Sequence, residues 1–260
     1  MSFFRNVLDR LTGKEVALRG GLSTPGVVRV GDTVRRPLQE NSAFVHEVLQ
    51  HLERREFDGA PRFHGIDEKG RAILTYLSGT VPRQVGGYQP SEWLAAARLL
   101  RQLHDATMDF PLGGDHEIIC HGDPCPGNCV FRNGVPFAFI DFDGARPGKR
   151  EEDVGYAAWM WLHIGDRKIA PQKQGADLVD FVAAYDEAAT WDPLEAVIRA
   201  QETTVKRIPN RFKWAVVKGW AQGCLAWTVR HRHDIAAGVA MRREALRSSV
   251  AAAKGQTTAG

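Results

Sequence analysis

A single dipeptide constrains the local fold of this chain more than any other feature of its sequence. Asn133-Gly134 stands between two apolar, β-prone runs, Cys129–Phe131 and Val135–Ile140. Asn-Gly flanked in this way is the strongest short-range signal for a β-hairpin, because a type I′ turn needs positive φ at both central residues. The pairs that a two-residue loop imposes on the strands are Arg132 with Val135, Val130 with Phe137 and Asn128 with Phe139.

The open end of this predicted hairpin carries oxygen-bearing side chains. Alternate residues of a strand share a face, so Asp141 points to the same side as Phe139, which faces Asn128. We therefore expect Asn128 and Asp141 to present oxygen atoms to a common point, which suits a hard cation such as Mg²⁺. Asp143 follows two residues later and is expected beside the same ion or on a second one.

A loop just before the hairpin carries another acid. Asp123 lies five residues before Asn128, in a loop that begins with His121-Gly122. This order is typical of a phosphoryl-transfer site, in which the first Asp takes the proton of the acceptor hydroxyl while the Asn and a later Asp hold Mg²⁺ against ATP. Each motif alone usually forms a turn or a cap, but their conjunction is far more specific. Asp123 is thus the predicted catalytic base, and His121 beside it is expected to brace the loop rather than transfer a proton.

On these residues the chain resembles the aminoglycoside phosphotransferase and choline kinase superfamily. Its members carry H-G-D-x-x-x-x-N and then I-D-F/W-D/E in this order, and the resemblance is tight over residues 118–161 and looser elsewhere. It implies an α+β, protein-kinase-like fold of two lobes. A small β-rich lobe over residues 1–77 would cover the nucleotide, and a larger, mainly helical lobe over residues 78–260 would hold the catalytic and substrate sites. The implied activity is Mg²⁺-dependent transfer of the γ-phosphoryl group of ATP to a hydroxyl of a small molecule, such as an aminoglycoside, an amino alcohol or a sugar.

A glycine-rich turn near the amino terminus is the predicted nucleotide-covering loop, with an ordinary hairpin as the alternative. Backbone N–H groups beside glycines can approach phosphates closely, and hydroxyls can add donors. The candidate residues are Gly20, Gly21, Ser23 and Thr24. At the other end of this lobe, Tyr76 closes a strand that resembles the linker between lobes, whose backbone would meet adenine.

The predicted strand Thr33–Pro37, which follows the Gly31-Asp32 turn, carries no lysine for the phosphates, only two arginines. The resemblance favours Arg36 over Arg35 for that role, and either would serve a phosphate as a bidentate donor. The next segment, Ser42–Arg54, is predicted to be helical and should carry the acidic partner of the strand cation. Glu40 and Glu47 are the candidates, although neither stands where the superfamily places its Glu.

Composition narrows the remaining function classes. The net charge of +3 and the absence of a dense Lys/Arg run exclude nucleic acid as the expected partner. No apolar run approaches the roughly 18 residues of a membrane span, and the first twenty residues lack the core of a signal peptide, so a cytoplasmic protein without a membrane partner is expected. The alternative to an enzyme is a kinase-fold regulatory or immunity protein that binds a nucleotide or a peptide without turnover. The intact Asp123, Asn128 and Asp141 favour the enzyme.

Overall fold

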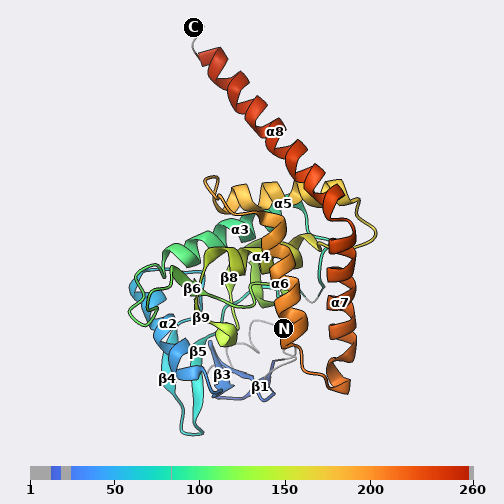
Figure 1. Ribbon diagram of the computed structural model, residues 1–260. Coiled ribbons are helices and arrows are strands. Elements are labelled where there is room, and N and C mark those ends of the chain that lie inside the picture. Colours follow the sequence, from blue (N-terminus) through green and yellow to red (C-terminus); the bar gives the residue numbers. More distant parts are fainter. Residues whose placement is uncertain (1–12, 19–24, 83, 258–260) are drawn as a thin grey trace. The chain divides into compact units, whose positions relative to one another are not determined.

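The computed structural model describes residues 13–18, 25–82 and 84–257 (Figure 1). The chain divides into two compact units, one formed by Met1–Arg83 with Gln102–Lys149 and the other by Gln84–Arg101 with Arg150–Gly260. Among the described residues the first unit contains all the strands, including the predicted hairpin, and the regular structure of the second unit is helical. An amino-terminal sheet followed by a mainly helical part is the arrangement that the sequence predicts. The lobe boundary expected after residue 77 stays a prediction.

The sheet of the first unit is antiparallel throughout. Its strands lie in the order β1-β2-β3-β5-β4. Their bounds are β1 Val16–Ala17, β2 Val28–Val30, β3 Thr33–Pro37, β4 Phe63–Ile66 and β5 Arg71–Thr75. In the pairing of β3 with β5, Arg35 lies opposite Ile73 and Arg36 opposite Ala72. Because side chains alternate along a strand, the two arginines point to opposite faces of the sheet.

The helix α2, Ser42–Arg54, follows β3 directly and has the bounds that the sequence predicts. It contributes a buried apolar side to the core of this unit. The buried apolar residues of the helix are Val45, Val48, Leu49 and Leu52. This spacing of three and four residues places them on one stripe of the helix, as in an amphipathic surface helix.

A network of ion pairs links Glu15, just before β1, to the residues at the start of β5. Glu15 Oε1 lies 2.8 Å from both Arg71 Nη2 and Lys69 Nζ. Hydrogen bonds from Arg71 and then Lys69 lower the pKa of the Glu15 carboxyl to about 2. Asp67 joins the same network through Arg71 Nη2, at 2.8 Å, and through Arg35 Nε, at 3.6 Å.

We expect the contribution of Glu15 to stability to disappear in acid. A carboxyl whose pKa is lower in the folded state stabilises that state fully above its ordinary pKa near 4.5. The stabilisation is then lost between about pH 4.5 and about pH 2 as the proton binds. The melting temperature of Glu15→Gln should therefore lie below that of the wild type at pH 7, and the two should converge toward pH 2.5. Glu68→Gln, at an exposed site on the turn between β4 and β5, is the matched control for losing one charge. A difference that stays constant with pH would contradict the assignment.

The predicted hairpin is present, with β7 at Cys129–Arg132 and β8 at Val135–Phe139. Asn133 and Gly134 both have positive φ, 52° and 78°, as a type I′ turn requires. The predicted pairing of Arg132 with Val135 is confirmed, but the other two pairs are wrong. Their observed partners are Val130 with Ala138 and Cys129 with Phe139.

A β-bulge at Phe137 causes this shift of register. The bulged Phe137 ring is only half-buried and packs under the Arg132 guanidinium, 3.6 Å from the ring centroid. Ala138 and Phe139 on its carboxy-terminal side are both fully buried, although strict alternation would expose one of them. An extra residue in one strand re-aims the side chains that follow it, and here it keeps both apolar residues in the core.

Two further strands complete the first unit, β6 at Ile118–Cys120 and β9 at Arg146–Gly148, paired antiparallel. The helices beyond α2 have the bounds α3 Pro90–Asp105, α4 Arg150–Leu162, α5 Pro171–Tyr185, α6 Pro193–Arg207, α7 Ala215–Arg230 and α8 Arg232–Thr257. In the second unit α5 crosses α8 closely, since a Cβ on Gly175 would lie 2.1 Å from Ile235 O. Across the described part of the chain, each helix is too short or too polar to span a bilayer.

Candidate active site

The loop from His121 to Asn128 begins at the end of β6 and runs into β7. His121 is fully buried within it, and both of its ring nitrogens contact the backbone. The N–H of Asp123 donates to Nδ1 at 3.3 Å, and Nε2 lies 3.1 Å from Ile140 O. A ring that accepts at Nδ1 must carry its proton on Nε2 and donate it to the carbonyl. This geometry suits the bracing role expected for His121 and ties the loop to the end of β8.

Gly122 has a φ of +84°, and its backbone touches that of Gly144 in the short 3₁₀ turn Phe142–Gly144. A Cβ built on Gly122 would lie 2.2 Å from Gly144 O, which is far inside van der Waals contact. The loop that carries Asp123 and the turn that follows Asp141 therefore pack backbone to backbone. No side chain fits at residue 122 unless one of the two segments moves.

Gly122→Ala is expected to destabilise the protein by about 3 kcal/mol, because backbone strain at positive φ adds to a steric clash. Gly134→Ala is the matched control, since its φ of +78° imposes the same strain but no atom lies within 4 Å of its Cβ. That control should cost only about 1 kcal/mol. Denaturant unfolding of both variants measures the difference, and equal losses would show that the close approach to Gly144 is absent.

Asn128 is bonded to Asp123 through its side-chain amide. Its Nδ2 donates to Asp123 Oδ2 at 2.8 Å and to Asp123 O at 3.1 Å. With the nitrogen directed at Asp123, the amide oxygen is directed elsewhere and can serve as a ligand. At the same end of the hairpin, the N–H of Ile140 donates to Asn128 O at 2.8 Å. Asn128 thus joins the two segments that carry Asp123 and Asp141.

Cys125 is half-buried in the same loop. Burial raises the pKa of its thiol well above the ordinary value, and the negative charge of Asp123 together with a hydrogen bond to that carboxylate raises it further. The side chain is therefore a neutral thiol at physiological pH. Because a cysteine nucleophile must be a thiolate, Cys125 is not suited to covalent catalysis.

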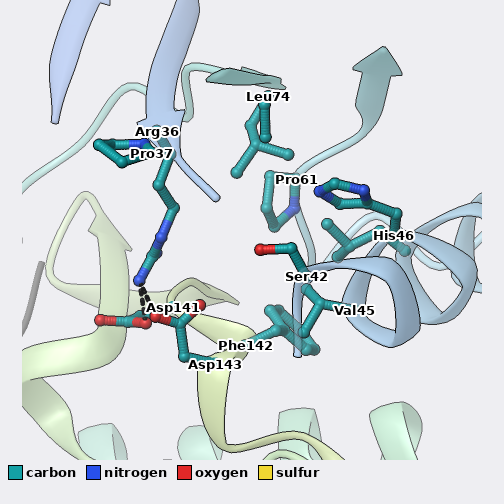
Figure 2. A pocket seen from close by; sticks show the side chains of 12 residues that line it. Arg36, Pro37, Ser42, Val45, His46, Pro61, Leu74, Asp141, Phe142 and Asp143 are labelled. Carbon is teal, nitrogen blue, oxygen red and sulfur yellow. Dashed lines mark hydrogen bonds and ion pairs between the residues drawn. The ribbon is translucent and has the colours of Figure 1, made fainter. Parts of the chain in front are cut away.

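Asp141 and Asp143 converge on one cation, the Arg36 guanidinium (Figure 2). Arg36 Nη2 donates to Asp141 Oδ1 at 2.8 Å, and the same nitrogen also donates to Asp143 Oδ2. Asp141 itself has a left-handed backbone, with φ 66° and ψ 63°, two residues after the end of β8. Asn41, the residue before α2, holds the same segment by donating from Nδ2 to Ala145 O at 3.0 Å.

The pocket beside this ion pair is lined by one side of α2 as well as by Arg36 and the acidic segment. The lining residues contributed by α2 are Ser42, Val45, His46 and Leu49. The space left open is about 20 Å³, enough for roughly one water molecule and far too small for a nucleotide. His46 stacks on Phe63 with ring centroids 3.8 Å apart, and burial lowers its pKa. Glu40 and Glu47 are exposed and do not line this pocket, so Arg36 meets Asp141 and Asp143 there instead of a helix glutamate.

The other predicted nucleotide contacts lie apart from the acidic pair. Arg35 points to the opposite face of the sheet, where it bonds to Thr33 Oγ1 and pairs with Asp67. The Arg29 guanidinium carbon lies 3.8 Å from the centroid of the Tyr76 ring. The backbone N–H of Tyr76 donates to Asp32 O at 2.8 Å. The four residues of the predicted nucleotide-covering loop, Gly20, Gly21, Ser23 and Thr24, lie outside the described residues.

The sequence analysis did not predict two contacts of the candidate site. The pairing of Arg36 with Asp141 and Asp143 joins residues more than a hundred positions apart, and no local pattern announces it. Asn41 directly precedes a helix, where Asn is usually an N-cap, but its side chain makes no cap hydrogen bond and reaches Ala145 instead. The acids nearby in sequence that were candidates to pair with Arg36 are Glu40 and Glu47. Both are exposed, and Arg36 pairs with other acids.

Comparison with known proteins finds similar sequences and similar folds. The model of the family described as the phosphotransferase enzyme family matches residues 87–196, which include the whole loop and hairpin. The trifolitoxin immunity protein of Rhizobium leguminosarum bv. trifolii is 28% identical over 263 residues, covering 87% of this chain and 99% of that protein.

Solved structures of similar fold include two kinases. An ethanolamine kinase from Plasmodium vivax matches with a TM-score of 0.54 and 13% identity, covering 83% of this chain and 81% of the other. The aminoglycoside phosphotransferase APH(3'')-Id from Streptomyces rimosus, solved with ADP and streptomycin, matches with a TM-score of 0.52 and 14% identity, covering 75% of this chain and 95% of the other. The likeness confirms the predicted fold class. The chain has the protein-kinase-like fold of these two structures, and the model of the phosphotransferase enzyme family matches its residues 87–196.

Proposed function

We propose that this protein is an ATP-dependent kinase that transfers the γ-phosphoryl group to a hydroxyl of a small molecule, such as an aminoglycoside, an amino alcohol or a sugar. The observation that carries the proposal is the linkage of Asp123, Asn128 and Asp141 at one end of the hairpin. Asn128 bonds to Asp123 through its side chain and to the segment before Asp141 through its backbone. A base beside a pair of oxygen ligands is the arrangement that phosphoryl transfer needs.

Asp123 is the proposed catalytic base. Its Oδ2 accepts from Asn128 Nδ2, which fixes the orientation of the carboxylate. In the reaction the acceptor hydroxyl donates its proton to Asp123 as its oxygen bonds to the transferred phosphorus. A base that only has to receive this proton and orient the hydroxyl needs position more than a raised pKa.

The residues around the acidic pair fit a divalent cation. Two carboxylate oxygens already converge on a single cationic nitrogen, and the Asn128 amide oxygen would add a third hard ligand. Among the described residues no cluster of three or more His, Cys, Asp or Glu side chains suits a metal, so an amide must complete the set. Asn128 and Asp141 would hold Mg²⁺, with Asp143 beside them. A bound Mg²⁺ supplies charge neutralisation for the phosphates.

The nucleotide phosphates are proposed to meet Arg36, which lies closest to the acidic pair. Arg35, Tyr76 and the glycine-rich turn with Gly20, Gly21, Ser23 and Thr24 remain the further candidates for nucleotide contacts. The ADP and streptomycin bound to the phosphotransferase from Streptomyces rimosus support a nucleotide and a hydroxylated acceptor as ligands of this fold. Residues 1–77 would then cover the nucleotide and residues 78–260 would hold the acceptor, in the cytoplasm, where ATP and Mg²⁺ are available.

A screen for turnover tests this function. The purified protein is incubated with Mg-ATP and a panel of aminoglycosides, amino alcohols and sugars, and phosphorylated products are detected by mass spectrometry. We expect at least one hydroxylated compound to gain a phosphoryl group, and Asp123→Asn to abolish most of that gain. If no compound is modified although Mg-ATP binds, the kinase proposal fails in favour of the second candidate.

The second candidate is a kinase-fold immunity or regulatory protein that acts by binding alone. The similarity to the trifolitoxin immunity protein, which extends over 99% of that protein, favours it. Expression of the wild type and of Asp123→Asn in a trifolitoxin-sensitive bacterium tests it. Equal protection by both forms would support binding without turnover, and protection by the wild type alone would support the kinase.

A further inference from the structure

The Arg36 guanidinium stands where a divalent cation is proposed to bind. Its Nη2 donates to both Asp141 and Asp143, and the side chain of Arg36 is only 14% exposed. The two carboxylates are more open, at 30% and 33%. One nitrogen therefore occupies the point toward which two of the proposed metal ligands aim their oxygens.

Electrostatics explains why a cation must be there. Two carboxylates that share a site repel each other, and an opposite charge within a few ångströms offsets that repulsion. Charge-assisted hydrogen bonds from a guanidinium satisfy this need. Mg²⁺ held by the same oxygens would satisfy it as well, but it would repel the guanidinium that now lies against them.

The surroundings of Arg36 favour its pairing with Asp141 and Asp143 over pairing with a glutamate of α2. The pocket-lining side of α2 presents Ser42 and His46 rather than a glutamate, and burial lowers the pKa of His46. The acids that Arg36 meets are thus those of the site itself. Its backbone lies in β3, where it pairs with Ala72 of β5, so only the side chain has to move for the ion pair to open.

We propose that Arg36 and a divalent cation compete for Asp141 and Asp143, so that the protein binds the cation strongly only when nucleotide phosphates draw the guanidinium away. Arg36 then acts as an internal counter-ion of the empty site and as a phosphate ligand of the filled one. The first half needs only the ion pair. The second half rests on the proposed nucleotide binding.

The competition is tested without nucleotide. Mn²⁺ is titrated into the wild type, Arg36→Met and Arg55→Met, and free Mn²⁺ is measured by electron paramagnetic resonance. Arg36→Met should bind Mn²⁺ about tenfold more tightly or better, because the cation no longer has to displace a charge-assisted pair. Arg55→Met removes an exposed guanidinium of the same unit and should match the wild type. Equal Mn²⁺ affinity of Arg36→Met and the wild type overturns the proposal.

Folding of the variants is checked by thermal denaturation, and Arg36→Gln replaces Arg36→Met if the latter does not fold. Gln removes the charge but keeps a hydrogen-bond donor, so the expected tightening is the same. If no folded variant of Arg36 binds Mn²⁺ more tightly than the wild type, the proposed competition is wrong.

The second half is tested by adding ADP to the same titrations. In the wild type ADP should raise the affinity for Mn²⁺. In Arg36→Met this increase should be smaller, because the ion pair that ADP would open is already absent. If Arg36→Met binds Mn²⁺ more tightly but ADP binds to neither protein, the competition stands and the proposed nucleotide function fails. If ADP binds to both while their Mn²⁺ affinities remain equal, the proposed function survives and the inference about Arg36 is wrong.

Discussion

Asp123→Asn is expected to lower kcat by about 10² or more, at the lower end of general-base effects. The substitution keeps the size of the side chain and an oxygen that can accept from Asn128 Nδ2, so the loop geometry should survive. It removes the group that receives the proton of the acceptor hydroxyl. Affinity for Mg-ATP should stay nearly unchanged, because the proposed nucleotide and metal ligands are other residues.

Steady-state kinetics with the acceptor found in the screen, together with calorimetry of Mg-ATP binding, measures both quantities. Asp115→Asn, at an exposed site of the same unit, is the control for losing one carboxylate. His121→Gln should cost less than Asp123→Asn, since both ring nitrogens of His121 are bonded to the backbone. Turnover by Asp123→Asn at the wild-type rate would remove the catalytic base and leave nucleotide binding alone as the function.

Asp141→Asn should weaken Mg-ATP binding by about 10² or more, because even outer partners of metal ligands cost 10–100-fold when they are replaced. Asn is the best choice for this test. Asp141 has a φ of 66°, and Asn is among the few residues that tolerate the left-handed region. Asp141→Ala would add backbone strain to the loss of the ligand and would confuse the two effects.

Calorimetry with ATP in the presence of Mg²⁺, and again with EDTA, separates the metal-dependent part of the affinity. Asp143→Asn serves as the comparison and should lose less, because Asp143 is expected beside the primary ion rather than as its main ligand. Thermal denaturation of Asp141→Asn should show an intact fold. The role proposed for Asp141 cannot stand if this variant binds Mg-ATP with wild-type affinity.

Local signals predicted the parts of this fold that local forces determine. The Asn133-Gly134 turn forms as expected, because the two residues themselves adopt the positive φ that the turn demands. The register beyond it does not, because the bulge at Phe137 depends on burial of Ala138 and Phe139 against other segments. A rule of strict alternation contains no information about that burial.

The candidate site also combines features that depend on local sequence with features that depend on distant segments. Spacing alone placed Asp123 and Asn128 together, and they are bonded. The partner of Arg36 could not be predicted in this way, because it depends on how β3 and the segment after β8 meet in three dimensions. Glu47 was the first acid of the helix that follows β3, but helix phase turns its side chain toward solvent.

The contact between Gly122 and Gly144 has a consequence for reading sequences of this fold. The glycine of the H-G-D motif, Gly122, is required because two backbones touch there, whether or not the protein performs any reaction. A descendant that had abandoned catalysis would still need this glycine in order to fold, and it would still match this letter in a motif search. Asp123 is the more diagnostic letter, because an uncharged side chain could accept the hydrogen bond from Asn128 Nδ2 in its place but could not take up a proton.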